Sequence, residues 1–281
     1  QKRLLIFLVR VRIRFCRIFC YSASMHCIDM LCADRHLGKV DKASLSQQTL
    51  MEMLIAGIEN KESIMESTET IDDYTQWWDV TTNEHGQVIE IEWSDFSLVG
   101  SVALQWLPET VSNLYLNLNS LDGAIDLTAL PYALIEIDLH SNKFCGTIDL
   151  QHLPERLESM DLSYNNLSGL LHMHALPSSL TSINLGYNSF EGSVDLALLP
   201  RKVELLALSF TGLSGTVDLT HLPDTLLHLY INGNNFYGET YFTKLPTALV
   251  RLDVSDTDLS GIIFRQKGTT VNTRSSCVKI R

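Results

Sequence analysis

The 281-residue sequence lacks the features that mark several common classes of protein. Within the first 40 residues, the longest uncharged stretch, residues 18–28, falls well short of the roughly 20 apolar residues that a membrane-spanning helix needs. It contains no signature of a serine hydrolase, a protein kinase, a P-loop protein or a zinc protease. The sequence therefore offers no convincing membrane span, and we expect neither a catalytic site nor a cofactor.

Cysteine is scarce outside the N-terminal segment. Four of the six cysteines lie within the first 40 residues, and only Cys145 and Cys277 follow. No C-x-x-C pair is present, so the sequence has neither the disulfide framework of a small secreted domain nor a typical zinc site. The cysteines therefore do not indicate whether the protein belongs to an oxidising or a reducing compartment.

Positive charge is also scarce over most of the chain. Residues 1–40 carry eight Lys and Arg against two acidic residues, whereas residues 41–281 carry 13 against 31. The balance of residues 41–281 is 13 minus 31, or −18, which should repel the phosphates of nucleic acids. No nucleic acid is expected as a partner, and a protein ligand with basic side chains fits this charge better.

The first 40 residues form a basic segment that we expect to be poorly structured. A basic start followed by a six-residue apolar run, residues 4–9, suggests a secretory signal, but the run is shorter than the usual 7–15 residues. We interpret residues 1–24 as a processed, truncated or mis-called segment, with a degraded signal or membrane anchor as the alternative.

Residues 41–84 are expected to cap the following region. The sequence from Ser44 to Gln47 fits a helix-capping box, and apolar residues at helical spacing predict an amphipathic helix over residues 46–59. The neighbouring Trp77 and Trp78 precede a predicted strand. We interpret them as core residues, one of which closes the end of the first repeat.

All seven prolines lie in a regular series of Leu-Pro pairs. The prolines recur every 23 residues, at Pro108, Pro131, Pro154, Pro177, Pro200, Pro223 and Pro246. A constant period of 20–50 residues is the signature of a solenoid built from stacked units. We number each unit from its proline, as position 1. The same frame extends back to residue 85, which gives about eight units over residues 85–267.

Within a unit, the residue types predict two strands and a ladder of amides. Apolar residues at positions 7 and 9 predict a short strand with one buried face. Apolar residues at positions 18 and 20 predict a second one. Position 12 is asparagine in five units, and its buried amides should satisfy backbone groups of neighbouring coils; they are Asn119, Asn142, Asn165, Asn188 and Asn234. Thr211 and Thr257 interrupt this ladder, and a Thr can supply part of the bonding.

The frame P-x-x-L-x-x-L-x-L-x-x-N-x-L-x-G-x-I-D-L-x-x-L resembles a leucine-rich repeat (LRR). It is most similar to the LP-initiated repeats of protist and plant-type LRR proteins. The resemblance implies an α/β-type repeat solenoid, mostly β, shaped as a horseshoe with parallel strands on its concave face and short second strands or turns elsewhere. It also implies protein binding through the concave face and no enzymatic activity.

Residues 78–88 resemble the N-terminal cap of plant LRR domains, although the cap's cysteines are missing. The missing cysteines put the disulfide-capped extracellular form in doubt. A secreted or cell-surface location is still favoured over a cytoplasmic one.

The side chains that point outward from the concave strands are the candidate binding residues. If equivalent residues of stacked coils lie about 5 Å apart, three aromatic residues at position 11 form a column beside two carboxylates at position 8. Such exposed aromatic rows are typical anchors of protein interfaces, but here they can equally shield the ladder from solvent. The candidate set is Tyr115, Asp138, Asp161, Tyr164, Tyr187, Phe210 and Tyr230.

Two other groups of polar residues are interpreted as structural. A second column at position 19 contains Asp126, Asp149, Asp195 and Asp218. Stacked carboxylates can bind a cation, but we expect each of these to accept hydrogen bonds from nearby Thr or backbone groups. His172 and His174 offer only two metal ligands, too few for a site. We therefore expect no metal.

Two functional hypotheses follow. The first is a non-enzymatic LRR module that recognises a protein, as a ligand-binding domain or a scaffold. The second is the sensor or ectodomain part of a larger signalling protein, such as a receptor kinase or a ubiquitin ligase, whose catalytic domain lies outside this sequence. Residues 268–281 are polar, and we expect them to form a tail that is frayed, truncated or covered by a partner. The oligomeric state is not indicated.

Overall fold

The computed structural model describes residues 42–65 and 73–281. The basic segment predicted over residues 1–40 lies outside the described residues. Among the described residues, no helix has the length and apolar character needed to cross a bilayer.

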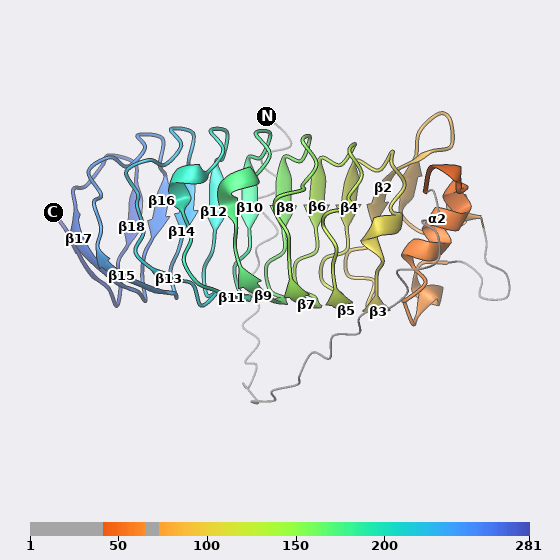
Figure 1. Ribbon diagram of the computed structural model, residues 1–281, viewed down its shortest axis with the longest axis horizontal. Helices are drawn as coiled ribbons and strands as arrows, with labels where there is room; N and C mark the ends of the chain where they lie inside the picture. The colour runs from red at the N-terminus through yellow and green to blue at the C-terminus, as the bar shows by residue number, and fades with distance from the viewer. Residues whose placement is uncertain (1–41, 66–72) are drawn as a thin grey trace. The chain divides into compact units, whose positions relative to one another are not determined.

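Stacked parallel strands form the main sheet of the solenoid, as predicted (Figure 1). Each three-residue strand between residues 113 and 253 occupies positions 6–8 of its unit and pairs in register with the next one. Among the described strands of this sheet, only β1 is antiparallel to its neighbour, β2. In order, the ten strands are β1 Val80–Thr82, β2 Val88–Glu92, β4 Asn113–Tyr115, β6 Glu136–Asp138, β8 Ser159–Asp161, β10 Ser182–Asn184, β12 Leu205–Ala207, β14 His228–Tyr230, β16 Arg251–Asp253 and β18 Thr270–Asn272.

Second strands follow the turn after each main strand and form two smaller sheets. The five-stranded sheet contains β3 Val99–Ser101, β5 Ser120–Ala124, β7 Lys143–Thr147, β9 Asn166–Leu170 and β11 Ser189–Glu191. The four-stranded sheet contains β13 Ser214–Gly215, β15 Asn235–Glu239, β17 Asp258–Ile263 and β19 Cys277–Ile280.

The five-residue second strands, β5, β7, β9 and β15, run over positions 13–17, not over positions 18–20 as predicted. Positions 18 and 20, such as Ile125 and Leu127, are buried, which explains the strand-like alternation. Between them, however, the carboxylate of Asp126 accepts a hydrogen bond from the backbone N–H of Thr128 and turns the chain. The buried residues on either side of this turn therefore give the same alternating apolar pattern in the sequence as a strand.

Each proline begins a turn that leads into a main strand. The proline carbonyl accepts a hydrogen bond from the backbone N–H three residues later in all seven units, over 3.0–3.2 Å, as between Val111 and Pro108. The leucine before the proline is buried or packs against the core, as Leu107 does. The Leu-Pro pairs thus fix the entry to each coil and belong to the scaffold.

The predicted asparagine ladder is present. The side-chain N–H of Asn165 donates to the carbonyls of Leu139, 3.0 Å away in the preceding coil, and of Leu162, 3.1 Å away in its own coil. Its side-chain oxygen accepts from the backbone N–H of Phe144 at 3.0 Å. The other four asparagines make the corresponding bonds, in which the side-chain oxygen holds the start of the preceding second strand. These are Asn119, Asn142, Asn188 and Asn234.

Thr211 coincides with the break between the two smaller sheets. Its hydroxyl donates to the carbonyl of Leu208 and to the side-chain oxygen of Asn234, so it replaces part of the asparagine bonding as expected. A hydroxyl on so short a side chain provides no amide oxygen for the preceding coil. The five-stranded sheet ends in that coil, at β11, and β13 starts the next sheet.

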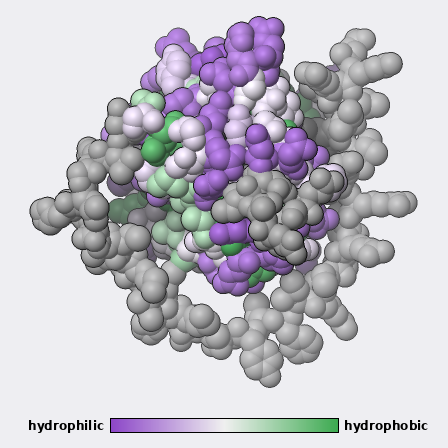
Figure 2. Space-filling view, turned by 90° about the vertical axis from the view of Figure 1, so that its right-hand side faces the viewer, coloured by the Kyte–Doolittle hydropathy of each residue, from purple (hydrophilic) through white to green (hydrophobic). Residues whose placement is uncertain are grey.

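The described part of the predicted cap, residues 42–65 and 73–84, contains one α-helix, α2 Gln47–Leu54, which is shorter than the predicted helix over residues 46–59. Ser46 is its N-cap and accepts a hydrogen bond from the backbone N–H of Thr49, whereas Ser44 belongs to a preceding 3₁₀ helix. The described 3₁₀ helices are Lys42–Ser44, Lys61–Ser63, Tyr74–Gln76, Leu104–Trp106, Met173–Ala175 and Leu196–Leu198. Viewed from the end that carries α2, the visible coloured surface is mostly hydrophilic (Figure 2).

One of the two adjacent tryptophans fills the first coil, as predicted. Trp77 is buried and packs against Trp93 with ring centroids 6.3 Å apart, while Trp78 is half exposed. The indole N–H of Trp93 donates to the carbonyl of Trp78 at 2.8 Å. The contacts of Trp93 with Trp77 and Trp78 therefore attach the predicted cap to the first coil of the solenoid.

Residues 268–281 differ from the predicted tail. β18 pairs with β16, and β19 pairs with β17, so this segment adds a shortened further turn to give about nine turns. Val278 is buried and supplies apolar contact at this end of the core. Backbone pairing with the preceding coil is available to a polar sequence as well, which is why apolar periodicity did not reveal it.

Candidate functional site

The predicted binding residues fall into two groups on successive parts of the coil. Tyr115, Asp138, Asp161 and Tyr230 project from the main sheet, each at the last residue of its strand. Tyr164, Tyr187 and Phe210 lie three residues further on, in the turn that leads to the second strand. We call these three the aromatic column.

The aromatic column is a continuous stack, as the spacing of coils predicted. The rings of Tyr164 and Tyr187 are nearly parallel, with centroids 4.1 Å apart and an interplanar angle of 9°. The ring of Phe210 stacks on Tyr187 with centroids 4.9 Å apart. The three residues remain 52%, 41% and 42% exposed, respectively. Their outer surfaces are therefore available to a ligand.

The backbone beneath the column has a left-handed conformation. At Tyr164, Tyr187 and Phe210, φ lies between 53° and 55°, a region that costs a non-glycine residue roughly 1–2 kcal/mol. Other coils use Leu118, Ser141, Gly233 or Asp256 at the same position, so the turn does not require a ring. Stacking contributes about 0.5–1.5 kcal/mol per pair and offsets part of the strain.

Gly233 ends the column at its C-terminal side. A Cβ atom at Gly233 would overlap the ring of Phe210, so the missing side chain gives that ring its space. Gly233 also has a left-handed φ of 65°. The last ring of the column therefore lies over the backbone of the next coil.

Next to the column, Asp138, His140 and Asp161 form a half-buried cluster. Asp138 accepts hydrogen bonds from the backbone N–H of His140 at 3.0 Å and binds its ring Nδ1 at 2.7 Å. Asp161 accepts from the hydroxyl of Ser163 at 2.6 Å and from the side-chain N–H of Asn184 at 2.8 Å. His140 occupies position 10, and its pairing with Asp138 was missed because no repeat pattern marks it.

The cluster shifts the acidity of its members. Burial lowers the pKa of His140, but the hydrogen bond and charge of Asp138, with the charge of Asp161, outweigh it and raise the pKa above 6.5. Burial, with repulsion from Asp138, raises the pKa of Asp161 despite the bonds from Ser163. Burial, the hydrogen bond and charge of Tyr187, and the charge of Asp161 raise the pKa of Tyr164 to about 12. The hydroxyl of Tyr164 therefore stays protonated near neutral pH.

Asp138, His140 and Asp161 are also the one group of three in the described part of the chain whose potential metal-ligand atoms converge, within 4.8 Å of one another. The bonds around Asp161 recur at Asp253, which accepts from Ser255 and from Asn272 in the same way. This repetition indicates that the bonds serve to join coils. We assign no metal to the cluster.

The two remaining candidates are held by neighbouring side chains. The hydroxyl of Tyr115 donates a hydrogen bond to the carboxylate of Glu136 at 2.7 Å. Burial, together with this bond and the negative charge of Glu136, raises the pKa of Tyr115. Tyr230 stacks against His228, with ring centroids 6.2 Å apart, and the guanidinium of Arg251 lies 5.8 Å from its ring. Glu136, His228 and Arg251 all occupy position 6 of their units, where the residue type changes from coil to coil and therefore did not mark them in the sequence.

The second aspartate column is structural, as predicted. Asp126, Asp149, Asp195 and Asp218 each accept a hydrogen bond from the backbone N–H two residues later. The hydroxyl and backbone N–H of Thr220, followed by His221, lower the pKa of Asp218 to about 2. These carboxylates stabilise the turn after the second strand.

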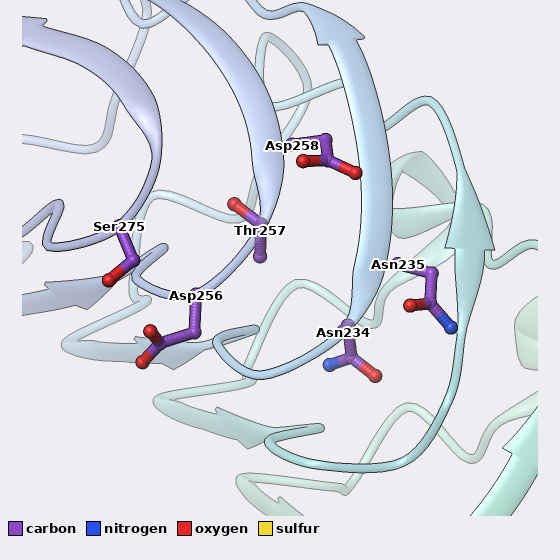
Figure 3. A pocket seen from close by; sticks show the side chains of 6 residues that line it. All are labelled: Asn234, Asn235, Asp256, Thr257, Asp258 and Ser275. Carbon is purple, nitrogen blue, oxygen red and sulfur yellow. The ribbon is translucent and has the colours of Figure 1, made fainter.

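A small recess of ≈ 170 Å³ opens at the turns between the main and second strands, nearer the C-terminus than the aromatic column (Figure 3). It lies beside Thr257, where the asparagine ladder is interrupted by a shorter side chain. Its lining is polar throughout, with Asp256 and Asp258 beside Thr257 and with Asn234, Asn235 and Ser275 from the adjoining coils. It lacks the apolar surface that most small-molecule sites contain, so we favour the aromatic column as the functional surface.

Comparison with known proteins agrees with this architecture. Residues 156–174 match the family described as Leucine Rich Repeat. The matched segment is thus a leucine-rich repeat (LRR), and the chain has the solenoid fold of such repeats. No curated protein matches the sequence of the chain.

Solved structures show the same fold at low sequence identity. The PEPR1–AtPEP1 structure has a TM-score of 0.50 and 20% identity, over 83% of this chain and 42% of that one. The Arabidopsis receptor kinase HAESA, with the peptide hormone IDA and the co-receptor SERK1, has a TM-score of 0.52 and 20% identity over 83% and 50%. A plant ice-binding protein has a TM-score of 0.51 and 19% identity over 84% and 94%. The chain thus spans half or less of the PEPR1 and HAESA chains, and the likeness is one of fold.

Proposed function

We propose that this chain is a non-catalytic LRR module that binds a protein or peptide through the aromatic column and the adjoining main sheet. The observation that carries the proposal is the stack of three exposed rings in a turn that other coils build without a ring. Rigid aromatic side chains contribute large contact area at little entropic cost, and interfaces use them as anchors. The turn itself does not require a ring, because other coils build it with Leu118, Ser141 or Asp256.

The charge of the main sheet favours a ligand with basic side chains. Its N-terminal half, strands β2, β4, β6 and β8, carries carboxylates and no Lys or Arg. These carboxylates are Glu90, Glu92, Glu136, Asp138 and Asp161. Complementary charge accelerates encounter and excludes acidic competitors, nucleic acids among them. Arg251 and His228 lie at the other end of the sheet.

The receptor structures with this fold support a peptide or protein ligand, since those of PEPR1 and HAESA were solved with AtPEP1 and IDA. A role as the sensor part of a larger signalling protein at the cell surface remains our second proposal. In this sensor role, the protein uses the same binding surface. The reading frame of the parent transcript distinguishes the two, because a downstream kinase or membrane span supports the second and contradicts the first.

The decisive experiment is a pull-down with the full chain, in which bound proteins are quantified by mass spectrometry. The double variant Tyr187→Ala/Phe210→Ala should lose its specific partners. Tyr132→Ala/Tyr241→Ala is the matched control, because both tyrosines are about two-thirds exposed and lie outside the column. If the column variant recovers every partner as the wild type does, the column is structural and the proposal fails. Raising the salt concentration should weaken the binding of a basic partner.

A further inference from the structure

We propose that Asn166 is an acceptor for N-linked glycosylation. Asn166, Leu167 and Ser168 form the one N-x-[ST] sequence in the chain. The two adjacent asparagines have opposite environments. Asn165 is only 8% exposed and is fully engaged in the ladder, whereas the side chain of Asn166 is exposed to solvent. Only the exposed residue of this pair lies in the acceptor sequence.

The fold leaves room for a glycan at this position. Asn166 is the first residue of β9, at position 13 of its unit. The residues at position 13 of the neighbouring coils are also exposed, including Lys143 and Ser189. Between the acceptor and Ser168, Leu167 is buried and fixes the direction of the strand. A glycan on Asn166 therefore projects into solvent without displacing core residues.

The modification is a group transfer with a defined donor. The side-chain amide nitrogen of Asn166 attacks the anomeric carbon of a lipid-linked oligosaccharide diphosphate. A carbon–nitrogen bond forms, the carbon–oxygen bond to the diphosphate breaks, the lipid diphosphate leaves, and the nitrogen loses one proton. The hydroxyl of Ser168 completes the acceptor sequence; in the folded protein it makes one long hydrogen bond, 3.4 Å, to the carbonyl of Gly146.

The position also bears on ligand access, a consequence that rests on the proposed function. Asn166 follows Tyr164 by two residues and lies on the side of the aromatic column that continues into the second sheet. A glycan there shields this side and leaves the side facing the main sheet open. Ligands then approach the column over the acidic strands, where Asp138 and Asp161 lie.

The test is secretion of the full chain, behind a cleavable leader, from a eukaryotic host. We expect its intact mass to include one N-glycan, which peptide N-glycosidase removes while converting Asn166 to aspartate. Asn166→Gln and Ser168→Ala should each abolish the glycan, and Ser168→Ala does so with the acceptor asparagine intact. A secreted wild-type chain without a glycan at Asn166 overturns the proposal.

A matched variant tests whether the position in the repeat is accessible. Tyr237→Thr, in the Asn166→Gln background, creates a new N-x-T acceptor sequence that begins at Asn235, at position 13 of another coil. This variant should carry one glycan, now at Asn235. A variant without a glycan contradicts the claim that position 13 is accessible to glycosylation. Mass reports the modification and pull-down reports binding, so the two proposals fail separately. Partner binding by Asn166→Gln should equal that of the glycosylated chain, because the glycan leaves the open side of the column unchanged.

Discussion

The ring of Tyr187 lies 4.1 Å from the ring of Tyr164, at an angle of 9°, across two coils of the solenoid. The two residues are 23 positions apart in sequence, so their contact is a direct product of the repeat. Both have a left-handed backbone, and both remain exposed. The stack is thus a preorganised apolar surface beside a group of carboxylates.

The first prediction concerns the end of the column. Gly233→Ala should displace the ring of Phe210, and it should also strain a left-handed residue by about 1 kcal/mol. Gly86→Ala is the matched control, because Gly86 has a similar φ of 72° and open space around its Cβ position. Denaturant unfolding should show a larger loss for Gly233→Ala. Equal losses contradict the proposed ring contact. In a Phe210→Ala background, Gly233→Ala and Gly86→Ala should lower the free energy of unfolding by similar amounts.

The second prediction concerns the ladder. Asn165→Ala leaves the backbone N–H of Phe144 and the carbonyls of Leu139 and Leu162 without their partners, which should cost about 2–4 kcal/mol of unfolding free energy. Asn166→Ala, one residue away but exposed, should change stability by less than about 0.5 kcal/mol. Chemical unfolding of both variants, produced without glycosylation, measures the difference. A mild effect at Asn165 contradicts the role of the ladder.

The third prediction concerns the gap in the ladder. Thr211→Asn restores an amide that can accept from the backbone of the preceding coil, as Asn188 does for Leu167. We expect an increase of about 1 kcal/mol in the free energy of unfolding. Hydrogen exchange should show stronger protection of the amides in β11 and β13. Unchanged protection there means that Thr211 does not cause the break between the sheets.

The fourth prediction concerns pH. The folded protein raises the pKa of His140 above 6.5, so its contribution to stability is complete below pH 6.5 and is lost as pH rises through the raised pKa. His140→Gln should remove this part of the pH dependence, as measured by unfolding midpoints above and below that window. His152→Gln is the control, because its pair with Asp149 is exposed. An identical pH profile for wild type and His140→Gln refutes the pairing with Asp138 as the cause.

Much of the fold and part of the site follow from the sequence alone. The repeat interval places equivalent residues in adjacent coils, so the ladder of Asn165 and its equivalents, the hydrogen bonding of Asp126 and the stacking of Tyr164 on Tyr187 were all predictable. The physical reason is that every unit makes the same contacts with its neighbour. A pattern repeated in sequence then becomes a line of contacts in space.

Tertiary structure decided the features that the repeat does not encode. The second strands begin at position 13 because the ladder amides hold the preceding coil there, while buried residues around Asp126 only imitate a strand. The turn formed by residues 268–281 depends on backbone pairing with an existing edge, which apolar periodicity does not report. His140 meets Asp138 only because the turn after β6 folds back on its own strand. Periodicity determined which coils touch, and the local backbone determined which side chains meet.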